Sequence, residues 1–433
     1  MILNFSVKNF GSIKNNQTLS FEADDSKHLE DTYVVNLAGK RVLKLALIYG
    51  ANASGKTTIL KALNFLRALT LEPKSMKNDL LEFHPFLFDA NTPTQNTYIA
   101  IEFIQNNRIY YYSVELTREA IVSESLSYED PEQPMVEVYN RSTDLDNKFA
   151  YINFKEERKD IQILEANTLA NNTVLGGYLK TNIVQKELQD CIDWFQNYLN
   201  PMIYPKADLF SLISSEIDKK NISKYDVLEI LKKADFNISD IVLRKKEHDV
   251  PYDFIDYLKN KPNYSEENFL DLDGKRKYVT IDVGFEHTVN EVKYRLPIQE
   301  ESQGTRRYYG FAGLLSLLIK NSKAFLVDEL EASLHPDLYL HFLILFILNC
   351  RHSQIVATTH NRELLANKDI FRNDAIWFTD KEEDCATELY SLFDFHDSVV
   401  NDNTNILEAY KSGKLSGSPH LKDTFIDLTP WQE

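Results

Sequence analysis

The sequence predicts an α/β protein with a mixed β-sheet, an antiparallel hairpin region and a helical insertion in the middle of the chain. Three observations predict this class. Short apolar strands alternate with helices after residue 275, an apolar strand near residue 45 leads through a glycine-containing loop into a helix, and two strands of alternating pattern flank an asparagine-rich turn. Alternation of strand and helix is typical of parallel sheets, whereas the paired alternating strands are typical of an antiparallel hairpin.

The composition is that of a folded, globular protein. Hydrophobic residues make up 43% and charged residues 26% of the 433 residues, which is close to the globular average and excludes fibrous and disordered classes. Asp and Glu number 65 against 48 Lys and Arg, so the formal net charge is −17. Because a surface this acidic repels phosphates, a free-standing, non-specific DNA binder is disfavoured unless a local basic groove exists.

The sequence predicts a cytoplasmic protein without a membrane segment. Its three cysteines have no CxxC spacing, which argues against a disulfide framework and a thiolate metal site and fits a reducing compartment. No signal peptide is visible. The most apolar stretches, 311–319 and 342–348, are far shorter than the ~20 residues that a membrane helix needs.

Residues 1–150 are expected to form an N-terminal lobe. Its first strands are expected at 1–8, 18–22 and 42–49, and the last is nearly continuous in apolar residues, as a strand buried on both faces should be. A helix is expected over 56–69, where apolar residues recur at helical spacing. Strands at 97–104 and 108–116 flank Gln105-Asn106-Asn107, which predicts an antiparallel hairpin.

Residues 151–275 are expected to form a helical insertion subdomain. Amphipathic patterns at 184–199 and 224–233 predict helices, and Asn200-Pro201 and Pro251 interrupt the region. Since no sustained heptads are present, a compact helical subdomain is favoured over a long coiled-coil arm.

Residues 276–395 are expected to form a C-terminal lobe with strands and helices in alternation, as in a parallel sheet. The strands are expected at 278–283, 292–296, 324–328, 355–359 and 375–379. The helices between them are expected at 305–320, 336–350 and 361–367. An acidic C-terminal tail is expected over 396–433.

The segment Gly50-Ala-Asn-Ala-Ser-Gly55-Lys56-Thr57 matches the pattern GxxxxGK(S/T) completely. Its glycines let the backbone curl and aim N–H groups at phosphate oxygens, its lysine reaches the β- and γ-phosphates, and its hydroxyl holds Mg²⁺. The N-terminus of the following helix adds partial positive charge. The motif predicts a P-loop NTPase, with the candidate nucleotide-binding residues Gly50, Ala51, Asn52, Ala53, Ser54, Gly55, Lys56, Thr57 and Thr58.

Two later strands end in polar residues suited to phosphoryl transfer. The strand Ala324-Phe-Leu-Val ends in Asp328 and Glu329, where the aspartate can accept a Mg²⁺-bound water and the glutamate can orient or deprotonate the attacking water. The alternative is a strand that ends in solvated acids. His360 closes the apolar strand that begins at Ile355 and can donate a hydrogen bond to a γ-phosphate, although a lone histidine is often a satisfied structural group.

Glu301-Ser302-Gln303-Gly304-Thr305 precedes a helix that is expected to start near Arg306. A small hydroxyl and a glycine at a helix N-terminus form a helix end that can bind phosphate, and an ordinary N-cap is the alternative interpretation.

Together these segments resemble the ABC-type ATPase heads of the chromosome-maintenance and RecF kind. More narrowly, they resemble the ABC-like AAA-family ATPases of bacterial phage-defence systems, namely the abortive-infection ATPases, the RloA type and the AriA sensors of PARIS systems. The features are Val7-Lys-Asn-Phe-Gly-Ser-Ile13, Glu301-Ser-Gln-Gly-Thr305, Asp328-Glu-Leu-Glu-Ala-Ser-Leu-His-Pro336, Ala357-Thr-Thr-His-Asn361 and Asp374-Ala-Ile-Trp-Phe378. The resemblance covers 1–150 and 276–380, while the insertion matches only in being helical.

The resemblance implies an ABC-type head that binds and hydrolyses ATP. Lys56 and the P-loop would hold the phosphates, Thr57 and Asp328 would hold Mg²⁺, Glu329 would be the catalytic carboxylate, and His360 would sense the γ-phosphate. Ser302 and Gly304 would contact the ATP of a second subunit, so that a homo-oligomer forms through two heads around two ATPs. The chain departs from the transporter pattern in having Glu-Ser-Gln-Gly in place of Leu-Ser-Gly-Gly, and Gln95 is the nearest candidate for the Q-loop glutamine.

Three functions remain open from the sequence. The first is an anti-phage defence ATPase that senses infection through a phage protein trigger. Because the sequence shows no convincing nuclease motif, this ATPase would control an effector in trans, for which the resemblance implies a TOPRIM-like nuclease. The second is a RecF-like DNA-repair ATPase that clamps DNA between dimerised heads, for which Arg244-Lys-Lys246 and Lys275-Arg-Lys277 are the available basic clusters. The third is a nucleotide-gated scaffold with negligible turnover.

Overall fold

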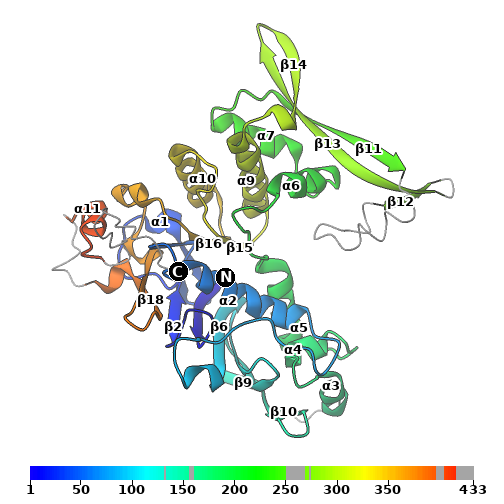
Figure 1. The fold of residues 1–433 in the computed structure, drawn as a ribbon, viewed down its shortest axis with the longest axis vertical. Coiled ribbons are helices and arrows are strands. Elements are labelled where there is room, and N and C mark those ends of the chain that lie inside the picture. The colour runs from blue at the N-terminus through cyan, green and yellow to red at the C-terminus, as the bar shows by residue number, and fades with distance from the viewer. Residues whose placement is uncertain (131–132, 156–159, 250–268, 273–274, 396–403, 416–433) are drawn as a thin grey trace, which may run out of the picture. The chain divides into compact units, whose positions relative to one another are not determined.

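The computed structural model describes the chain except residues 131–132, 156–159, 250–268, 273–274, 396–403 and 416–433. The chain divides into two compact units (Figure 1). The first unit comprises 1–205, 323–330 and 352–433, and the second comprises 206–322 and 331–351. This division differs from the expected boundaries near 150, 275 and 395, because residues that are distant in the sequence pair within each unit.

A five-stranded sheet organises the first unit. In order across the sheet, its strands are β15 (Ala324–Val327), β16 (Gln354–Thr358), β5 (Leu45–Gly50), β17 (Ile376–Lys381) and β18 (Thr387–Ser391). The first four run parallel and β18 is antiparallel to β17. Every residue of β5 is buried, which confirms the expectation from its apolar sequence.

Helix α2 (Lys56–Leu71) follows β5 and packs against β5, β15 and β16. Its buried face carries the apolar residues that predict it, which are Ile59, Leu60, Leu63 and Leu66. The helix expected over 56–69 is therefore confirmed, and its N-terminus lies at the end of the central strand of the sheet.

A seven-stranded antiparallel sheet forms the other large layer of the first unit. Its strands in order are β10 (Phe149–Phe154), β9 (Gln133–Asp144), β8 (Ile121–Asp130), β7 (Arg108–Leu116), β6 (Thr97–Gln105), β1 (Ile2–Lys8) and β2 (Gln17–Ser20). The predicted hairpin is confirmed, since β6 pairs with β7 around Asn106 and Asn107, whose φ angles are 51° and 61°. Two adjacent positive φ angles are typical of a type I′ turn.

Shorter elements complete the first unit. They are α1 (Glu30–Tyr33), β3 (Val34–Leu37), β4 (Lys40–Leu43), η1 (Thr92–Thr94), α3 (Ile161–Asn167), α4 (Val174–Tyr178), α5 (Lys186–Asp193), η2 (Trp194–Tyr198), η5 (Arg362–Ala366), η6 (Asn373–Ala375), η7 (Leu392–Asp394) and α11 (Ile406–Lys411). The single strand expected over 42–49 is divided at Lys44, because residues before it pair with β3 and residues after it join the five-stranded sheet. The helix expected over 361–367 is the 3₁₀ turn η5.

A buried ion pair explains why residues 170–174, which lead into α4, belong to the first unit. Glu124 and Arg141 are fully buried and lie 3.3 Å apart. Arg141 donates to the carbonyls of Ala170 and Asn172, and Glu124 accepts from the N–H of Val174. Because a buried charge needs compensating contacts, these bonds fix residues 170–174 to the antiparallel sheet. The helical insertion expected over 151–275 is thus shared between the two units.

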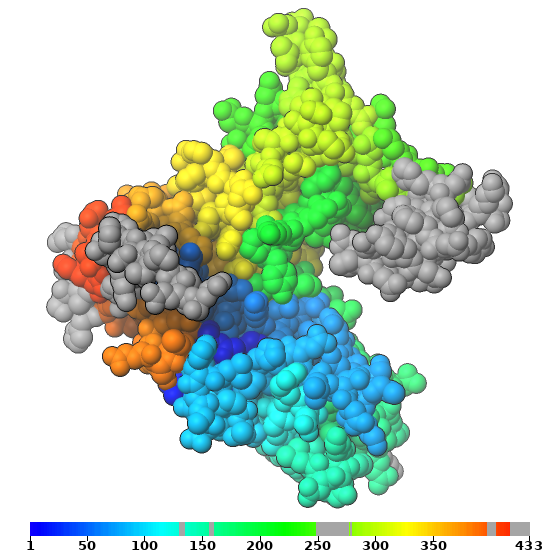
Figure 2. Space-filling model, in the orientation of Figure 1, coloured from blue at the N-terminus to red at the C-terminus, as the bar shows by residue number. Residues whose placement is uncertain are grey.

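In the part of the second unit that the structure describes, four helices pack with a small antiparallel sheet. The helices are α6 (Leu209–Asp218), α7 (Lys224–Lys233), α9 (Gln303–Lys320) and α10 (Pro336–Asn349), and the other elements are β11 (Asp240–Asp249), β12 (Phe269–Leu272), β13 (Lys275–Val289), β14 (Val292–Pro297) and η4 (Ile298–Glu300). Helix α9 contacts the other three helices. Strand β13 pairs with β11, β12 and β14, and the end of the β13–β14 hairpin projects beyond the helices of its unit (Figure 1, Figure 2).

The strands expected at 278–283 and 292–296 do not join a parallel sheet, so that part of the prediction is wrong. They are the arms of the antiparallel β13–β14 hairpin, in which Val289 pairs with Val292 around Asn290 and Glu291. A loop this short cannot make the crossover that a parallel pair requires.

Most of the expected acidic tail lies outside the described residues. The described part of it, 404–415, contains α11, whose Lys411 lies 3.3 Å from Glu363 of η5. In the part of the chain that the structure describes, no helix is both long and apolar enough to cross a membrane.

Candidate nucleotide-binding site

The P-loop connects β5 to α2, as the motif predicts. Gly50 ends the strand and Gly55 is the N-cap of the helix, with a φ of 106°. A Cβ atom on Gly55 would clash with Thr387 Oγ1, and one on Gly50 would clash with Thr379 Oγ1. Both glycines are therefore required by close packing, and Gly55 also by its left-handed backbone.

Hydroxyl groups of β17 and β18 support the loop. Ser54 Oγ lies 2.6 Å from Thr379 Oγ1, and Thr387 Oγ1 donates to the Ser54 carbonyl at 2.9 Å. Thr387 Oγ1 also contacts Ser12 Oγ at 2.8 Å. Sequence reasoning missed these supports, because nothing local to Thr379, Thr387 or Ser12 indicates that they meet the P-loop.

Lys56 and His360 lie close together. Lys56 is 5% exposed, and its Nζ donates to the carbonyls of Gly50 and Ala51 at 2.8 and 2.9 Å. The same Nζ lies 3.4 Å from Nδ1 of His360, which follows β16 and is exposed. The structure thus brings together the two residues that the sequence assigns to the β- and γ-phosphates.

Thr57 and Asp328 meet at the start of α2. Thr57 Oγ1 donates to Asp328 Oδ1 at 3.0 Å, and Asp328 is 6% exposed. Two oxygen ligands on adjacent corners of a Mg²⁺ octahedron lie about 2.9 Å apart when each metal–oxygen distance is about 2.0–2.1 Å. The two oxygens therefore have the spacing and the chemistry that Mg²⁺ needs. Among the described residues no cluster of three or more His, Cys, Asp or Glu could hold a metal.

Glu329 follows Asp328 directly and has a φ of 48°. This left-handed conformation is uncommon for a residue other than glycine, and such strain concentrates at functional sites. The turn directs the chain away from β15 immediately after Asp328.

Ser302 and Gly304 belong to the second unit. Ser302 is the N-cap of α9, and its Oγ accepts the N–H of Thr305 at 3.0 Å. A Cβ atom on Gly304 would meet nothing closer than the Ser333 carbonyl oxygen at 3.5 Å, which is ordinary contact. Ser302 is therefore the N-cap of α9, its role toward a phosphate stays a prediction, and packing within the chain does not require a glycine at 304.

The side chain of His287 contacts Glu301, the residue before the N-cap Ser302. Its Nε2 lies 2.9 Å from Glu301 Oε1 and its Nδ1 lies 2.6 Å from the Asn237 carbonyl oxygen. Since a carbonyl only accepts, Nδ1 is the donor to Asn237. The side chain of His287 thereby ties the β13–β14 hairpin to the start of α9.

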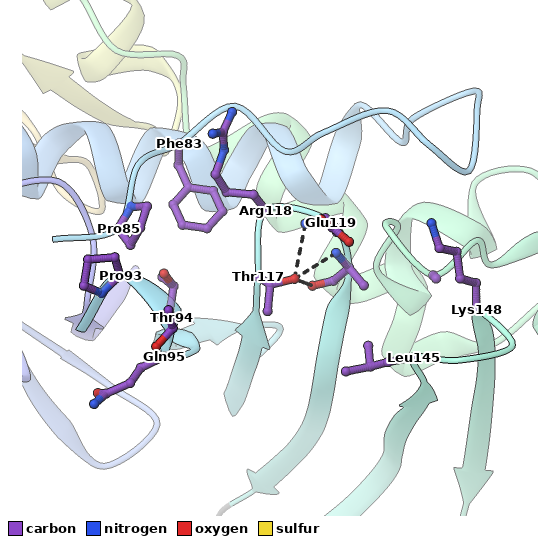
Figure 3. Close-up of a pocket in the computed structure, with 13 residues that line it drawn as sticks. Phe83, Pro85, Pro93, Thr94, Gln95, Thr117, Arg118, Glu119, Leu145 and Lys148 are labelled. Atoms are coloured by element: carbon purple, nitrogen blue, oxygen red, sulfur yellow. Dashed lines mark hydrogen bonds between the residues drawn. The ribbon is translucent and has the colours of Figure 1, made fainter. Parts of the chain in front are cut away.

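Gln95 lines a cavity of about 390 Å³ in the first unit. Figure 3 shows Phe83, Pro85 and Pro93 on one side of this cavity and Leu145 and Lys148 on the other. Its lining contains no residue of the P-loop and none of Asp328, Glu329 or His360. The assignment of Gln95 as the Q-loop glutamine remains a prediction.

The fold and the site define a class of protein. A parallel sheet with a phosphate-binding loop after its central strand, and a carboxylate beside the hydroxyl of that loop, is a P-loop NTPase. The predicted fold class is confirmed, and the chain is a P-loop NTPase of the AAA type. It belongs to the family of AAA domains described as putative AbiEii toxins of type IV toxin–antitoxin systems, which matches residues 45–366. No curated protein matches the sequence.

Solved structures of chromosome-maintenance heads show a distant likeness. An Smc head bound to the C-terminal winged-helix domain of ScpA has a TM-score of 0.43 and 14% identity, with 90% of this chain and 97% of that chain covered. The SMC head domain from Thermotoga maritima has a TM-score of 0.39 and 13% identity, covering 90% and 98%. An Smc head with an extended coiled coil, bound to the C-terminal domain of ScpA from Pyrococcus furiosus, has a TM-score of 0.39 and 14% identity, covering 90% and 96%.

The close packing of Gly55 yields a testable prediction. Gly55→Ala should weaken ATP binding, because its methyl group would displace Thr387 and shift the loop, and it should lower the free energy of unfolding by about 1–3 kcal/mol. Gly39→Ala is the matched control, since Gly39 also has a positive φ of 76° but a Cβ atom there would meet nothing within 4 Å. Calorimetric titration with ATP and urea unfolding measure the two effects. Unchanged ATP affinity in Gly55→Ala would contradict the packing argument.

Proposed function

We propose that the chain binds ATP together with Mg²⁺ and hydrolyses it to ADP and phosphate. The observation that carries the proposal is the 3.0 Å contact between Thr57 of the P-loop helix and Asp328 at the end of β15. This contact brings the phosphate-binding loop next to Asp328, and Glu329 is the following residue in the chain. Phosphoryl transfer to water needs this combination, because positioning and charge stabilisation provide most of the catalysis.

Each residue of the site has a role in this reaction. Lys56 and the backbone N–H groups of the P-loop would bind the β- and γ-phosphates. Thr57 and Asp328 would hold Mg²⁺, which neutralises charge on the phosphate oxygens. Glu329 would orient a water molecule and take its proton while the water oxygen bonds to the γ-phosphorus and the bond to the β-phosphate oxygen breaks. His360 would donate a hydrogen bond to the γ-phosphate.

The assignment of Glu329 predicts separate effects on binding and turnover. Glu329→Gln should retain ATP binding while turnover falls about 10²-fold or more, because an acid–base group is lost. Lys56→Ala should lose ATP binding, and Glu119→Gln, an exposed acid outside the site, should behave as wild type. Phosphate release and fluorescent-nucleotide titration report the two quantities. Hydrolysis by Glu329→Gln at the wild-type rate would refute the assignment.

We infer further that a second copy of the chain completes each site. Ser302 caps the N-terminus of α9, whose N–H groups favour an anion. A glycine at 304, which packing within the chain does not require, suits close approach by a ligand from outside the chain. The γ-phosphate held by Lys56 of the other copy would be that anion. Two-fold symmetry would then pair the sites, so that both copies contact each ATP.

Mixing two inactive variants tests the shared site. Ser302→Glu should keep ATP binding by its own P-loop but lose ATP-dependent association and turnover, because a carboxylate would face the γ-phosphate. Each proposed site combines Lys56 of one copy with Ser302 of the other. In a mixed dimer of Ser302→Glu and Lys56→Ala chains, one site therefore carries both substitutions and the other carries neither. Partial turnover should return from the site that carries neither. If the sites are strictly coupled, ATP-stabilised dimers of Glu329→Gln, seen by light scattering, still report the association. Full activity of a monomeric Ser302→Glu protein would overturn the shared site.

We propose that this ATPase acts in anti-phage defence by sensing infection through a phage protein and controlling an effector in trans. The support is the family, whose description names putative toxins of toxin–antitoxin systems, together with the narrower sequence resemblance. A TOPRIM-like nuclease is the effector that the resemblance implies. The ATPase cycle would couple the trigger to the effector.

The charge pattern of β11 and β13 favours this function over DNA clamping. Both basic clusters named from the sequence lie on these strands. Three of their lysines form ion pairs, namely Lys245 with Asp218, Lys246 with Asp282 and Lys277 with Glu247. Acids thus neutralise much of the positive charge that phosphate binding would need.

A plating assay tests the defence function. Cells that carry the wild-type chain with its neighbouring genes should form fewer plaques when challenged with a phage panel, and Lys56→Ala should remove the protection because ATP binding is lost. Glu119→Gln serves as the control and should protect as wild type does. Absence of protection, combined with improved survival of DNA damage, would favour the repair ATPase instead.

A further inference from the structure

Thr358, the last residue of β16, contacts both residues of the acidic pair. It is fully buried, and its Oγ1 lies 2.6 Å from Asp328 Oδ1 and 2.8 Å from the backbone N of Glu329. A carboxylate only accepts, so the Thr358 hydroxyl donates to Asp328 and uses a lone pair to accept the N–H of Glu329. One hydroxyl group therefore bonds to the side chain of one acid and to the backbone of the other.

The backbone of Thr358 strengthens this connection. Its carbonyl accepts the N–H of Leu330 at 3.0 Å, so Thr358 contacts three successive residues after β15. Glu329, the middle residue of the three, has the left-handed φ of 48°. A strained residue keeps its conformation only when its surroundings fix it, and the hydroxyl of Thr358 is one of the groups that fix the Glu329 peptide.

The position of Asp328 also depends on this hydroxyl. Asp328 Oδ1 accepts from Thr57 Oγ1 on one side and from Thr358 Oγ1 on the other. The bond from Thr358 is charge-assisted and short, which makes it strong and directional. It orients the carboxylate toward Thr57, the residue with which Asp328 would hold Mg²⁺.

We infer that Thr358 is a positioning residue for ATP hydrolysis, whose hydroxyl holds the metal-binding carboxylate of Asp328 and the backbone of Glu329 in one fixed arrangement. The inference rests on the proposed ATP hydrolysis. Neighbouring Thr359 does not share the role, because its Oγ1 accepts the N–H of Asn361 at 3.1 Å and meets neither acid. The hydroxyl at position 358, and not a buried hydroxyl in general, is therefore what matters.

Replacement of Thr358 by valine and by serine distinguishes the effect of the hydroxyl group on kcat from the effect of the methyl group. Thr358→Val keeps the shape and removes the hydroxyl, so kcat should fall about 10²-fold, the size of effect that small misplacement of reacting groups produces, with KM for ATP little changed. Thr358→Ser keeps the hydroxyl and should restore most of the wild-type kcat. A loss in Thr358→Ser equal to that in Thr358→Val would assign the effect to methyl packing and overturn the inference.

A second readout does not depend on turnover. Addition of Mg²⁺ should raise the affinity of the wild-type chain for the non-hydrolysable analogue AMP-PNP, measured by calorimetry, because Thr57 and Asp328 share the metal with the phosphates. In Thr358→Val this Mg²⁺-dependent gain should shrink, while affinity in EDTA stays as in wild type. An undiminished gain would overturn the inference. If the wild-type chain itself fails to hydrolyse ATP, the proposed function fails, and this titration still decides the role of Thr358.

Thr70→Val is the matched control for stability. Thr70 is also fully buried, and its hydroxyl donates to the Leu66 carbonyl within α2, away from the P-loop. This variant removes one buried threonine hydroxyl, so it should shift the thermal midpoint as Thr358→Val does while leaving kcat and the Mg²⁺ effect unchanged. Equal losses of kcat in the two valine variants would show a general effect of stability and refute the positioning role.

Discussion

Parallel pairing of β15, β16 and β5 is the constraint on which the site depends. In this register Val327 lies beside Ala357, and Thr358 lies beside Ile48. The three strands therefore end at the same edge of the sheet, and Gly50, Asp328 and His360 lie within two residues of the strand ends. A shift of one residue in either pair would turn every side chain of that strand to the opposite face and separate the P-loop from the carboxylates.

Hydroxyl side chains provide much of the local order around this edge. Thr379 and Thr387 support Ser54 in the loop, while Thr57 and Thr358 lie on either side of Asp328. Short hydroxyls suit this task, because each can donate and accept within a small volume and loses little side-chain entropy when buried. The loop itself is thus free to present its N–H groups, while the residues behind it set its shape.

The elements and residues that could be predicted from the sequence are those that a short, continuous segment of the sequence specifies. The P-loop, β5, α2 and the β6–β7 hairpin each have a motif, a periodicity or a turn within a short segment, and the structure contains all four, although β5 begins at Leu45 and not at residue 42. The roles of Glu329, His360 and Ser302 in catalysis stay predictions, although the structure now gives the contacts on which each role would depend.

The features that could not be predicted depend on contacts between distant residues. The division of the chain into units follows from pairings such as Arg141 with Ala170. The hydroxyls of Thr379 and Thr387, which support the P-loop, lie more than 300 positions from Ser54. The β13–β14 hairpin is missed because the first strand is expected to end at 283, whereas β13 continues to Val289 and leaves only Asn290 and Glu291 before Val292. The importance of Thr358 is hidden because it depends on which residues of another strand face its hydroxyl.

The turn at Glu329 also marks a boundary in the chain. Leu330 is the last residue of the first unit before the chain enters the second at Glu331, and Leu330 is fully buried with its N–H bonded to Thr358. Leu330 is therefore the only residue between the acidic pair, Asp328 and Glu329, and the peptide bond at which the chain enters the second unit. The buried side chain of Leu330 and its bond to Thr358 therefore fix the chain between the acidic pair and the point at which it leaves the first unit.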